Sequence, residues 1–305
     1  MGFTDYLQAR RTEIDAALGS ILATSPACPA IVTDAMRYSV SAGGKRLRPI
    51  LCLAGAEAVG GDRLLAMPAA CAVEMIHTYS LIHDDLPAMD NDTMRRGRPT
   101  LHVVAGEGMA ILAGDGLLTE AFALMARAPA TSDPAIVSRK LRVIAVIATA
   151  AGPGGMVGGQ ALDLAGSNGG ETGDTGRVVD ADSLRVMHAK KTGALIRAAA
   201  VAGAIMGGGD AGAVADIDRV AAEFGLAFQI VDDILDVEGA SATLGKTAGK
   251  DAAVGKPTYP ALYGLAAARR MAAECLERAE GILQGASLGD SHLVGIGRWI
   301  IDRNA

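Results

Sequence analysis

Apolar residues recur at spacings of three and four along almost the whole chain, and no stretch alternates apolar and polar residues convincingly. Because the α-helix turns once every 3.6 residues, this pattern predicts an all-helical protein. Glycine, proline and capping residues divide the pattern into separate helices. The predicted helices span about residues 4–23, 30–41, 49–59, 64–86, 107–127, 133–151, 153–164, 180–190, 192–207, 211–237, 258–285 and 289–302.

Two stretches interrupt this regularity. The uncharged run Val143 to Leu162 is about long enough to span a bilayer, but GPGG at 152–155 breaks it and favours two buried helix ends. The polar segment GSNGGETGDTG at 166–176 is expected to be an exposed loop inserted into the helical pattern. No repeat of fixed period occurs. The sequence therefore predicts one large all-helical domain over residues 1–305.

Composition narrows the class of protein. The chain has 305 residues, 50% of them hydrophobic and 3% aromatic, which is ample for a large core of helices packed on helices. A net charge of −6 argues against a nucleic-acid partner. The charged N-terminal stretch is unlike a signal peptide, so we expect a soluble cytoplasmic protein without stable membrane association. The cysteines form no CxxC pair and are expected to be apolar fillers in a reducing compartment: Cys28, Cys52, Cys71 and Cys275.

Acidic residues gather at two places within strongly apolar helical stretches. In HDDLPAMDND, Asp84 and Asp85 close a predicted helix, and Pro87 should break it so that Asp90 and Asp92 lie on the following turn. In FQIVDDILDVEG, three aspartates spaced three and four apart are expected to share a helix face, with Gln229 one turn earlier. These three are Asp232, Asp233 and Asp236.

A lone DDxxD is usually a solvated helix end, but unpaired carboxylates inside two apolar helices would be costly to bury. Two carboxylate sets without cysteine or histidine ligand spacing suit hard cations such as Mg²⁺. A calcium-binding EF-hand is excluded because its glycine and terminal glutamate are missing after Asp90. Magnesium bound in this way usually keeps positions open for phosphate oxygens.

Basic residues accompany both acidic clusters. Each one alone is more often a solvated surface charge, but beside carboxylates on an apolar chain they indicate a diphosphate cradle. They occur in GGKRLRP (Lys45, Arg46, Arg48), after the first cluster (Arg95, Arg96, Arg98), before Thr192 (Lys190, Lys191) and after the second cluster (Lys246, Lys250, Lys256).

Seven ordered motifs resemble those of the trans-isoprenyl diphosphate synthase family, and they span nearly the whole chain. They are GGKRLRP, EMIHTYSLIHDDLPAMDNDTMRRGRPTLH, LAGDGLL, GGQALDL, KKTGALI, GLAFQIVDDILD and GKDAAVGKPTYPAL. Four residues separate Asp85 from Asp90, as in bacterial farnesyl and bacterial or plant-type geranylgeranyl synthases. The ending WIIDRNA is similar to that of bacterial farnesyl diphosphate synthases. The resemblance implies a helical bundle around a central cavity and a homodimer.

The resemblance also implies roles for single residues. Mg²⁺, about three ions per site with Mn²⁺ as an alternative, would be held by Asp84, Asp85, Asp90, Asp232, Asp233 and Asp236. The allylic diphosphate would contact Arg95, Lys191, Gln229, Lys246 and Lys256, with Thr192 beside the reacting carbons. Isopentenyl diphosphate would be held by Gly44, Lys45, Arg48, His77 and Arg96. From the residues alone, His77 is better explained as a satisfied core histidine.

The product is expected to extend from Asp84 toward the beginning of its helix. Tyr79 lies five residues earlier, about 7.5 Å along the axis, and Ser80 lies beside it. An aromatic residue here resembles the farnesyl synthases, so farnesyl diphosphate is the expected product and geranylgeranyl diphosphate the alternative. A terpene cyclase would not need GGKRLRP, and its second motif usually mixes other residues with glutamate. A non-catalytic partner subunit would tend to lack aspartates that are present here.

Overall fold

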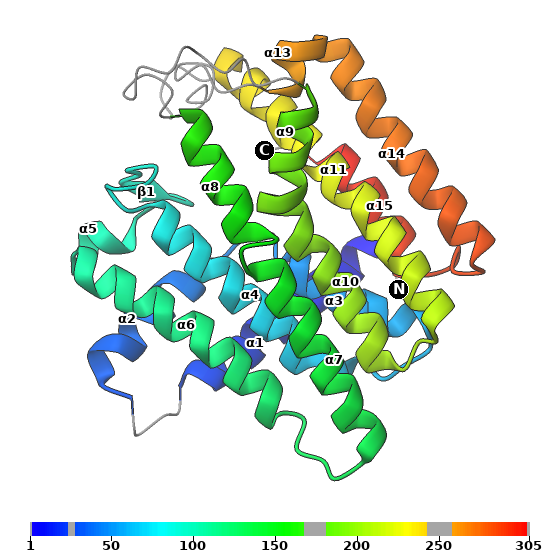
Figure 1. Cartoon of the computed structure of the whole chain (residues 1–305), viewed down its shortest axis with the longest axis horizontal. Helices are drawn as coiled ribbons and strands as arrows, with labels where there is room; N and C mark the ends of the chain where they lie inside the picture. The colour runs from blue at the N-terminus through cyan, green and yellow to red at the C-terminus, as the bar shows by residue number, and fades with distance from the viewer. Residues whose placement is uncertain (1, 24–27, 168–180, 243–257, 304–305) are drawn as a thin grey trace. The chain divides into compact units, whose positions relative to one another are not determined.

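The computed structural model describes residues 2–23, 28–167, 181–242 and 258–303, and within them it confirms the predicted all-helical fold (Figure 1). The chain divides into two compact units. The first comprises Met1–Ile147 and Ala202–Gly209, and the second comprises Ala148–Val201 and Asp210–Ala305. The prediction of a single domain over residues 1–305 stays a prediction.

The first unit is built around α4, which contacts α1, α2, α3 and α6. Asp62 caps the start of α4, because its side chain accepts a hydrogen bond from the Leu64 amide. Twelve of the 22 residues of α4 are buried, so the helix is the core of this unit. The helices of the unit are α1 Phe3–Leu22, α2 Ala30–Val40, α3 Leu47–Ala58, α4 Arg63–Asp84, α5 Leu101–Ala105, α6 Glu107–Arg127 and most of α7 Pro134–Ala151.

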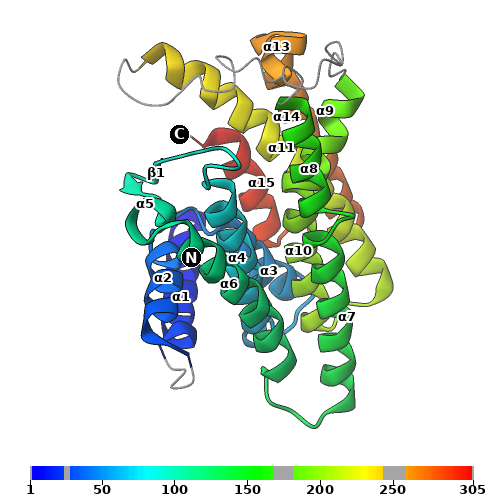
Figure 2. The same cartoon turned by 60° about the vertical axis from the view of Figure 1, so that its left-hand side comes forward.

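The second unit is organised by the long helix α11, which contacts α13, α14 and α15 (Figure 2). A π-helical turn, η1, joins α9 to α10 and contacts both α8 and α11. Glycines permit these approaches: a Cβ at Gly225 would lie 3.0 Å from the Gly193 Cα, and one at Gly159 would overlap the Lys191 backbone. The elements are α8 Met156–Ser167, α9 Ala181–His188, η1 Ala189–Gly193, the first part of α10 Ala194–Gly207, α11 Ala211–Ala242, α13 Tyr259–Tyr263, α14 Leu265–Gly285 and α15 His292–Asp302.

Helix boundaries agree closely with the predicted ones, and the differences have local causes. The predicted helix 258–285 is divided at Gly264, whose φ of +80° cannot continue an α-helix. The break at GPGG is confirmed, since α7 ends at Ala151 and α8 begins at Met156. The sequence did not predict α5, η1 or the two-residue strands β1 Met94–Arg95 and β2 Arg98–Pro99, which pair antiparallel. Most of the predicted loop 166–176 lies outside the described residues.

Within the described residues, three helical segments are long and apolar enough, by length and composition, to cross a membrane. They are Arg63–Asp84, Glu107–Arg127 and Pro134–Gly166. The prediction of buried cysteines is confirmed for Cys52, Cys71 and Cys275, whereas Cys28 is only half-buried. Burial, helped by nearby Glu74, raises the pKa of Cys71 to about 12, so this thiol is not a nucleophile at neutral pH.

Candidate functional site

The first acidic motif lies where α4 ends and folds back on itself. The helix ends at Asp84, and the Asp90 amide then donates to the Asp84 carbonyl at 2.8 Å. The Asp92 amide donates to the Asp85 carbonyl at 3.2 Å. The turn that Pro87 predicts therefore places Asp90 and Asp92 next to the C-terminal end of α4.

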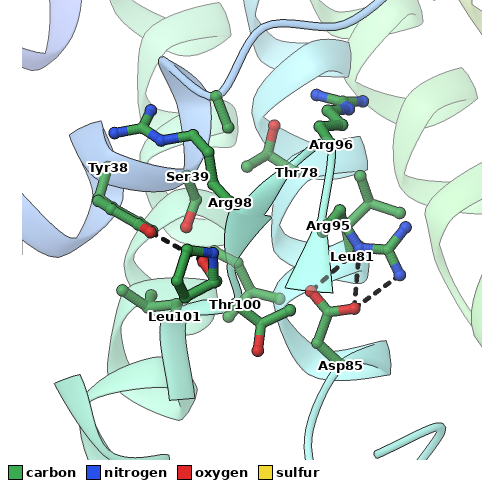
Figure 3. Close-up of a pocket in the computed structure, with 13 residues that line it drawn as sticks. Tyr38, Ser39, Thr78, Leu81, Asp85, Arg95, Arg96, Arg98, Thr100 and Leu101 are labelled. Atoms are coloured by element: carbon green, nitrogen blue, oxygen red, sulfur yellow. Dashed lines mark hydrogen bonds and ion pairs between the residues drawn. The ribbon is translucent and has the colours of Figure 1, made fainter. Parts of the chain in front are cut away.

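Asp85 is clamped by Arg95, which stands on strand β1 (Figure 3). The Arg95 Nη2 and Nε donate to Asp85 Oδ1 at 2.6 and 2.8 Å, and Nε also reaches Oδ2 at 3.0 Å. Burial raises the pKa of the Asp85 carboxyl, and Arg95 counteracts that effect only in part. The ion pair therefore fixes the orientation of the buried Asp85 carboxylate beside this turn.

The three arginines of the β1–β2 hairpin point in different directions. In Figure 3, Arg95 points to Asp85, Arg98 lies toward Tyr38, and Arg96 points away from both. Arg98 stacks over the Tyr38 ring at 4.8 Å, and Arg96 Nη1 donates to the Gly43 carbonyl. A cavity of about 40 Å³ opens beneath the hairpin, and its lining includes Asp85 and all three arginines.

The neighbourhood of His77 is strongly cationic. Burial lowers the pKa of His77 well below its ordinary value, and Arg48, Arg96, Arg95 and Arg46 lower it further. The imidazole is therefore neutral at pH 7 and can donate one hydrogen bond to an anion. Arg46 and Arg95 are paired with Glu74 and Asp85, so Arg48 and Arg96 are the candidates for binding an anion near His77.

The glycine-rich turn before α3 brings its own residues to this region. Gly44 has a φ of +132°, and a Cβ there would lie 2.7 Å from the Arg96 guanidinium, so a side chain would displace Arg96. The structure therefore brings Gly44 and Arg96, two residues of the predicted isopentenyl set, into contact. Lys45 and Arg48, both half-buried, flank them.

Arg46 has a different function from its neighbours in GGKRLRP. Its Nη1 donates to Glu74 at 2.7 Å, its Nε to Asp15 at 2.8 Å and its Nη2 to the Val40 carbonyl at 2.7 Å. The side chains of Arg46 and Glu74 are only 3% and 2% exposed. Burial lowers the pKa of Arg46, but Glu74 and Asp15 outweigh it and the net shift is upward. Arg46 is thus an internal tie between α1, α2, α3 and α4.

Tyr79 and Ser80, the predicted chain-length residues, lie one turn before Asp84. The Tyr79 ring is 7% exposed and packs edge-on against His83, with the ring centroids 5.5 Å apart. His83 in turn contacts the Ile111 carbonyl at 3.2 Å, and Gly114 leaves room for it on α6. The Ser80 hydroxyl donates back to the His77 carbonyl at 2.8 Å. Tyr79 is therefore held in place, whereas Ser80 occupies little space.

In the second unit, the neighbouring carboxylates of the second acidic motif have different partners. Asp232 accepts a hydrogen bond from Arg303 Nη2 at 2.6 Å, and its side chain is 40% exposed. Asp233 is 5% exposed and accepts from the Gln229 amide and the Tyr259 backbone, both at 2.9 Å. Consecutive helical residues are turned by about 100°, so the two side chains contact different elements. Asp236 lies one turn further on and is half-buried.

Lys191 is positioned by the π-helical turn η1, which also carries Thr192. Its Nζ donates to Asp163 of α8 at 2.5 Å, while Lys190 donates to the Gly154 carbonyl at 2.8 Å. The two lysines therefore point to different partners, and η1 directs Lys191 toward α8. A π-turn widens a helix locally and is frequent at functional sites.

Several buried polar groups lie in the same unit as this lysine, and His188 is close enough to feel its charge. His188 and Tyr259 pack together with ring centroids 5.7 Å apart. Burial lowers the pKa of His188 to about 4 and raises that of Tyr259 to about 12, so both are neutral at pH 7. Among the described residues, His188 Nδ1, Tyr259 OH and Gln160 Nε2 are buried without a hydrogen-bond partner. Such groups can accept a hydrogen bond from a bound ligand or water, or donate one to it.

Sequence reasoning assigned no role to Asp163, Tyr259 or Arg303. Asp163 lies in GGQALDL, Tyr259 in GKPTYPAL and Arg303 in WIIDRNA, all segments that carried the family resemblance. Their partners are remote in sequence, so spacing alone could not reveal them. The predicted ligands Lys246 and Lys256 lie outside the described residues, as does Lys250.

Comparisons with known proteins agree with these motifs. The Polyprenyl synthetase family model matches residues 29–284. The farnesyl diphosphate synthase of Geobacillus stearothermophilus is 49% identical over 268 residues, 88% of this chain and 87% of that protein. The chloroplastic geranylgeranyl pyrophosphate synthase 7 of Arabidopsis thaliana is 48% identical over 283 residues, 93% of this chain and 78% of that protein.

A solved structure of an FPP/GFPP synthase from Zymomonas mobilis has a TM-score of 0.83 and 35% identity, and covers 98% of each chain. The family match over most of the chain, the similar relatives and the likeness of fold all indicate one assignment. The chain is a prenyl-transferring enzyme that belongs to the polyprenyl synthetase family.

Proposed function

We propose that the enzyme condenses isopentenyl diphosphate with dimethylallyl and then geranyl diphosphate, to give farnesyl diphosphate and inorganic diphosphate, with Mg²⁺ as the cofactor. The observation that carries the proposal is the first acidic motif beside its arginines. Asp84, Asp85 and Asp90 lie at one helix end, where Arg95 bonds Asp85 and the charges of Arg95 and Arg96 also act on neutral His77. Carboxylates for a cation and donors for an anion are what a magnesium diphosphate needs.

The residues present fit a magnesium ion that is shared with substrate. Among the described residues, no three acidic, histidine or cysteine side chains are arranged as a metal cage. Mg²⁺ usually takes only one or two carboxylates and completes its shell with waters and phosphate oxygens. Such ions would draw one or two carboxylates each from Asp84, Asp85 and Asp90 at the first motif, and from Asp232, Asp233 and Asp236 at the second. When bound, the metal would offset negative charge on the leaving diphosphate.

The protein side chains then have separate tasks. Heterolysis of the allylic C–O bond leaves its electron pair on diphosphate, and fixed cations such as Arg95 and Lys191 stabilise that charge. The double bond of isopentenyl diphosphate attacks the allylic carbon and must already lie within about 3–3.5 Å, which is the task of the set around Arg48 and His77. The proton lost afterwards passes to the released diphosphate, so no side-chain base is required.

Incubation with labelled isopentenyl and dimethylallyl diphosphates tests this activity against the alternatives. A prenyl synthase consumes both substrates and releases a longer linear diphosphate. A terpene cyclase would give a cyclic hydrocarbon from a preformed allylic substrate, and a non-catalytic subunit would give no product alone. Failure to incorporate isopentenyl label, by a chain whose helical circular dichroism is normal, would contradict the proposal.

The two basic sets should differ in their effect on the two substrates. We expect Arg48→Ala to raise the KM for isopentenyl diphosphate by roughly ten- to a hundred-fold, the cost of one charge-assisted hydrogen bond. Lys191→Ala should instead raise the KM for the allylic substrate. Steady-state kinetics with each substrate varied in turn measure both constants. Lys190→Ala is the control, because Lys190 is adjacent to Lys191 in the chain but donates to the Gly154 backbone carbonyl. Equal effects of both alanine variants on both substrates would contradict the assignment.

Product length should depend on Tyr79. The similar relatives include both farnesyl and geranylgeranyl synthases, and the buried aromatic at Tyr79 favours the shorter product. Each added isoprene unit needs new volume along α4, and a packed ring cannot compress to provide it. We therefore expect Tyr79→Ala to move the main product from fifteen carbons toward twenty.

Chromatography of the dephosphorylated products measures this shift. Ser80→Ala is the matched control, because it changes the adjacent position without opening comparable space, and it should keep fifteen carbons. A wild-type enzyme that already makes mainly twenty-carbon product would refute the farnesyl proposal. A Tyr79→Ala variant that still stops at fifteen carbons would place the end of the pocket at another residue.

We also propose that the enzyme is a homodimer that associates through the outer face of α5 and α6. Four large apolar side chains on these consecutive helices are 44% to 55% exposed: Val103, Val104, Ile111 and Leu112. Large apolar side chains exposed on two helices that contact each other are a candidate interface. Light scattering at micromolar concentration should give twice the 30.9 kDa chain mass, and Leu112→Glu should lower it toward one chain. A wild-type mass of one chain would rule out the dimer.

A further inference from the structure

Arg303 follows directly after α15, which packs against α11 in the second unit (Figure 2). The residue is buried. Its guanidinium lies 3.8 Å from the centroid of the Phe228 ring. Its Nη2 donates to the Phe228 carbonyl at 2.7 Å and to Asp232 Oδ1 at 2.6 Å. The side chain is only 2% exposed, while the Asp232 side chain that it contacts is 40% exposed.

Arg303 thus holds the Asp232 carboxylate by one oxygen and leaves the side chain accessible to solvent. Phe228 precedes Asp232 by four residues on α11, so one helix face supplies both the stacking surface and the acceptor. The result is an Asp232 side chain that is oriented and still exposed, whereas the neighbouring Asp233 is buried. Both Asp233 oxygens accept hydrogen bonds within the protein, and the residue is 5% exposed. Of these two adjacent aspartates, Asp232 is the one that faces solvent.

A purely structural explanation accounts poorly for Arg303. Its side chain is 2% exposed, so its charge is held away from water beside the single carboxylate of Asp232. Its Nε and Nη1 are buried and have no hydrogen-bond partner within the described residues. An apolar side chain of similar length would fill the same space without the cost of desolvating a charge. The charge is therefore best explained by what it does to Asp232.

We propose that Arg303 is a positioning residue that orients Asp232 to receive a magnesium diphosphate. The inference rests on the proposed function, because it takes Asp232 as a ligand of that metal. A residue that hydrogen-bonds a metal ligand fixes its geometry before the metal arrives, and loss of such a residue typically weakens metal affinity roughly ten- to a hundred-fold. The C-terminal end of α15 would in this way contribute to metal binding without touching the metal.

The test measures metal loading directly. Calorimetric titration of Mg²⁺ into enzyme with saturating inorganic diphosphate should show roughly ten- to a hundred-fold weaker binding in Arg303→Gln. Arg298→Gln is the matched control: it lies on the same helix, its pair with Glu280 is 62% exposed on the arginine side, and it should bind as wild type. Asp232→Asn should weaken binding at least as much, and adding Arg303→Gln to it should cause little further loss.

The opposite results would overturn the inference. An Arg303→Gln variant with a lowered thermal midpoint but wild-type Mg²⁺ affinity would make Arg303 a structural brace only. Additive losses in the double variant would show that Arg303 does not act through Asp232. If Arg303→Gln does not fold, Arg303→Lys retains the charge without the planar fork and should show partial weakening. A wild-type enzyme that binds magnesium diphosphate but forms no prenyl product would refute the proposed function and leave this test intact.

Discussion

Asp84→Asn should lower turnover at least about a hundred-fold while the helical circular dichroism is unchanged. The substitution preserves size and removes the charge that would hold Mg²⁺ at the end of α4. Loss of one such interaction with the developing charge costs about 2.7–4 kcal/mol of transition-state stabilisation. Asp232→Asn should have an effect of the same order, because the second motif would hold metal as well.

Steady-state turnover with saturating substrates and varied Mg²⁺ measures this loss. Asp92→Asn is the informative comparison, since Asp92 lies 3.8 Å from Arg95 and is the aspartate of the first motif most easily placed outside the metal shell. It should lose less activity than Asp84→Asn. Near-normal turnover in either Asp84→Asn or Asp232→Asn would contradict the model in which both motifs bind metal.

Arg46→Ala should destabilise the fold by about 3–5 kcal/mol, the cost of leaving a buried charge without its partner. The uncompensated group would be Glu74, whose side chain is 2% exposed at the centre of α4. Arg298→Ala removes an exposed ion pair and should cost no more than about 1 kcal/mol. Urea unfolding followed by circular dichroism compares the two.

Arg46→Ala and Arg48→Ala separate structure from substrate binding within one seven-residue motif. The first should lower the unfolding midpoint, and the second should change the KM for isopentenyl diphosphate with little effect on stability. Arg46→Met combined with Glu74→Leu should recover much of the lost stability, because neither charge is then buried alone. Wild-type stability in Arg46→Ala would show that its three hydrogen bonds do not support the fold.

The amino-acid sequence alone determined the helical fold and the places where its helices break. A 3.6-residue period, Pro87 and the GPGG break act locally, so they can be read from neighbouring residues. The predicted helices therefore agree with the structure within a few residues, except where a glycine with positive φ divides α13 from α14. Motif order likewise identified the family, because seven motifs in sequence are specific without any coordinates.

Only the tertiary structure decided which partners charged residues that are close in sequence have. Arg46 and Arg48 lie two positions apart in GGKRLRP, yet Arg46 is buried and tied to Glu74, 28 residues away, while Arg48 is half-buried. Asp232 and Asp233 are adjacent, yet one pairs with Arg303, 71 residues distant, and the other with the Tyr259 amide, 26 residues distant. Periodicity reports which face a side chain occupies but not which remote group packs there. The partners of a charge are set by the packing of whole helices, and sequence spacing carries no record of them.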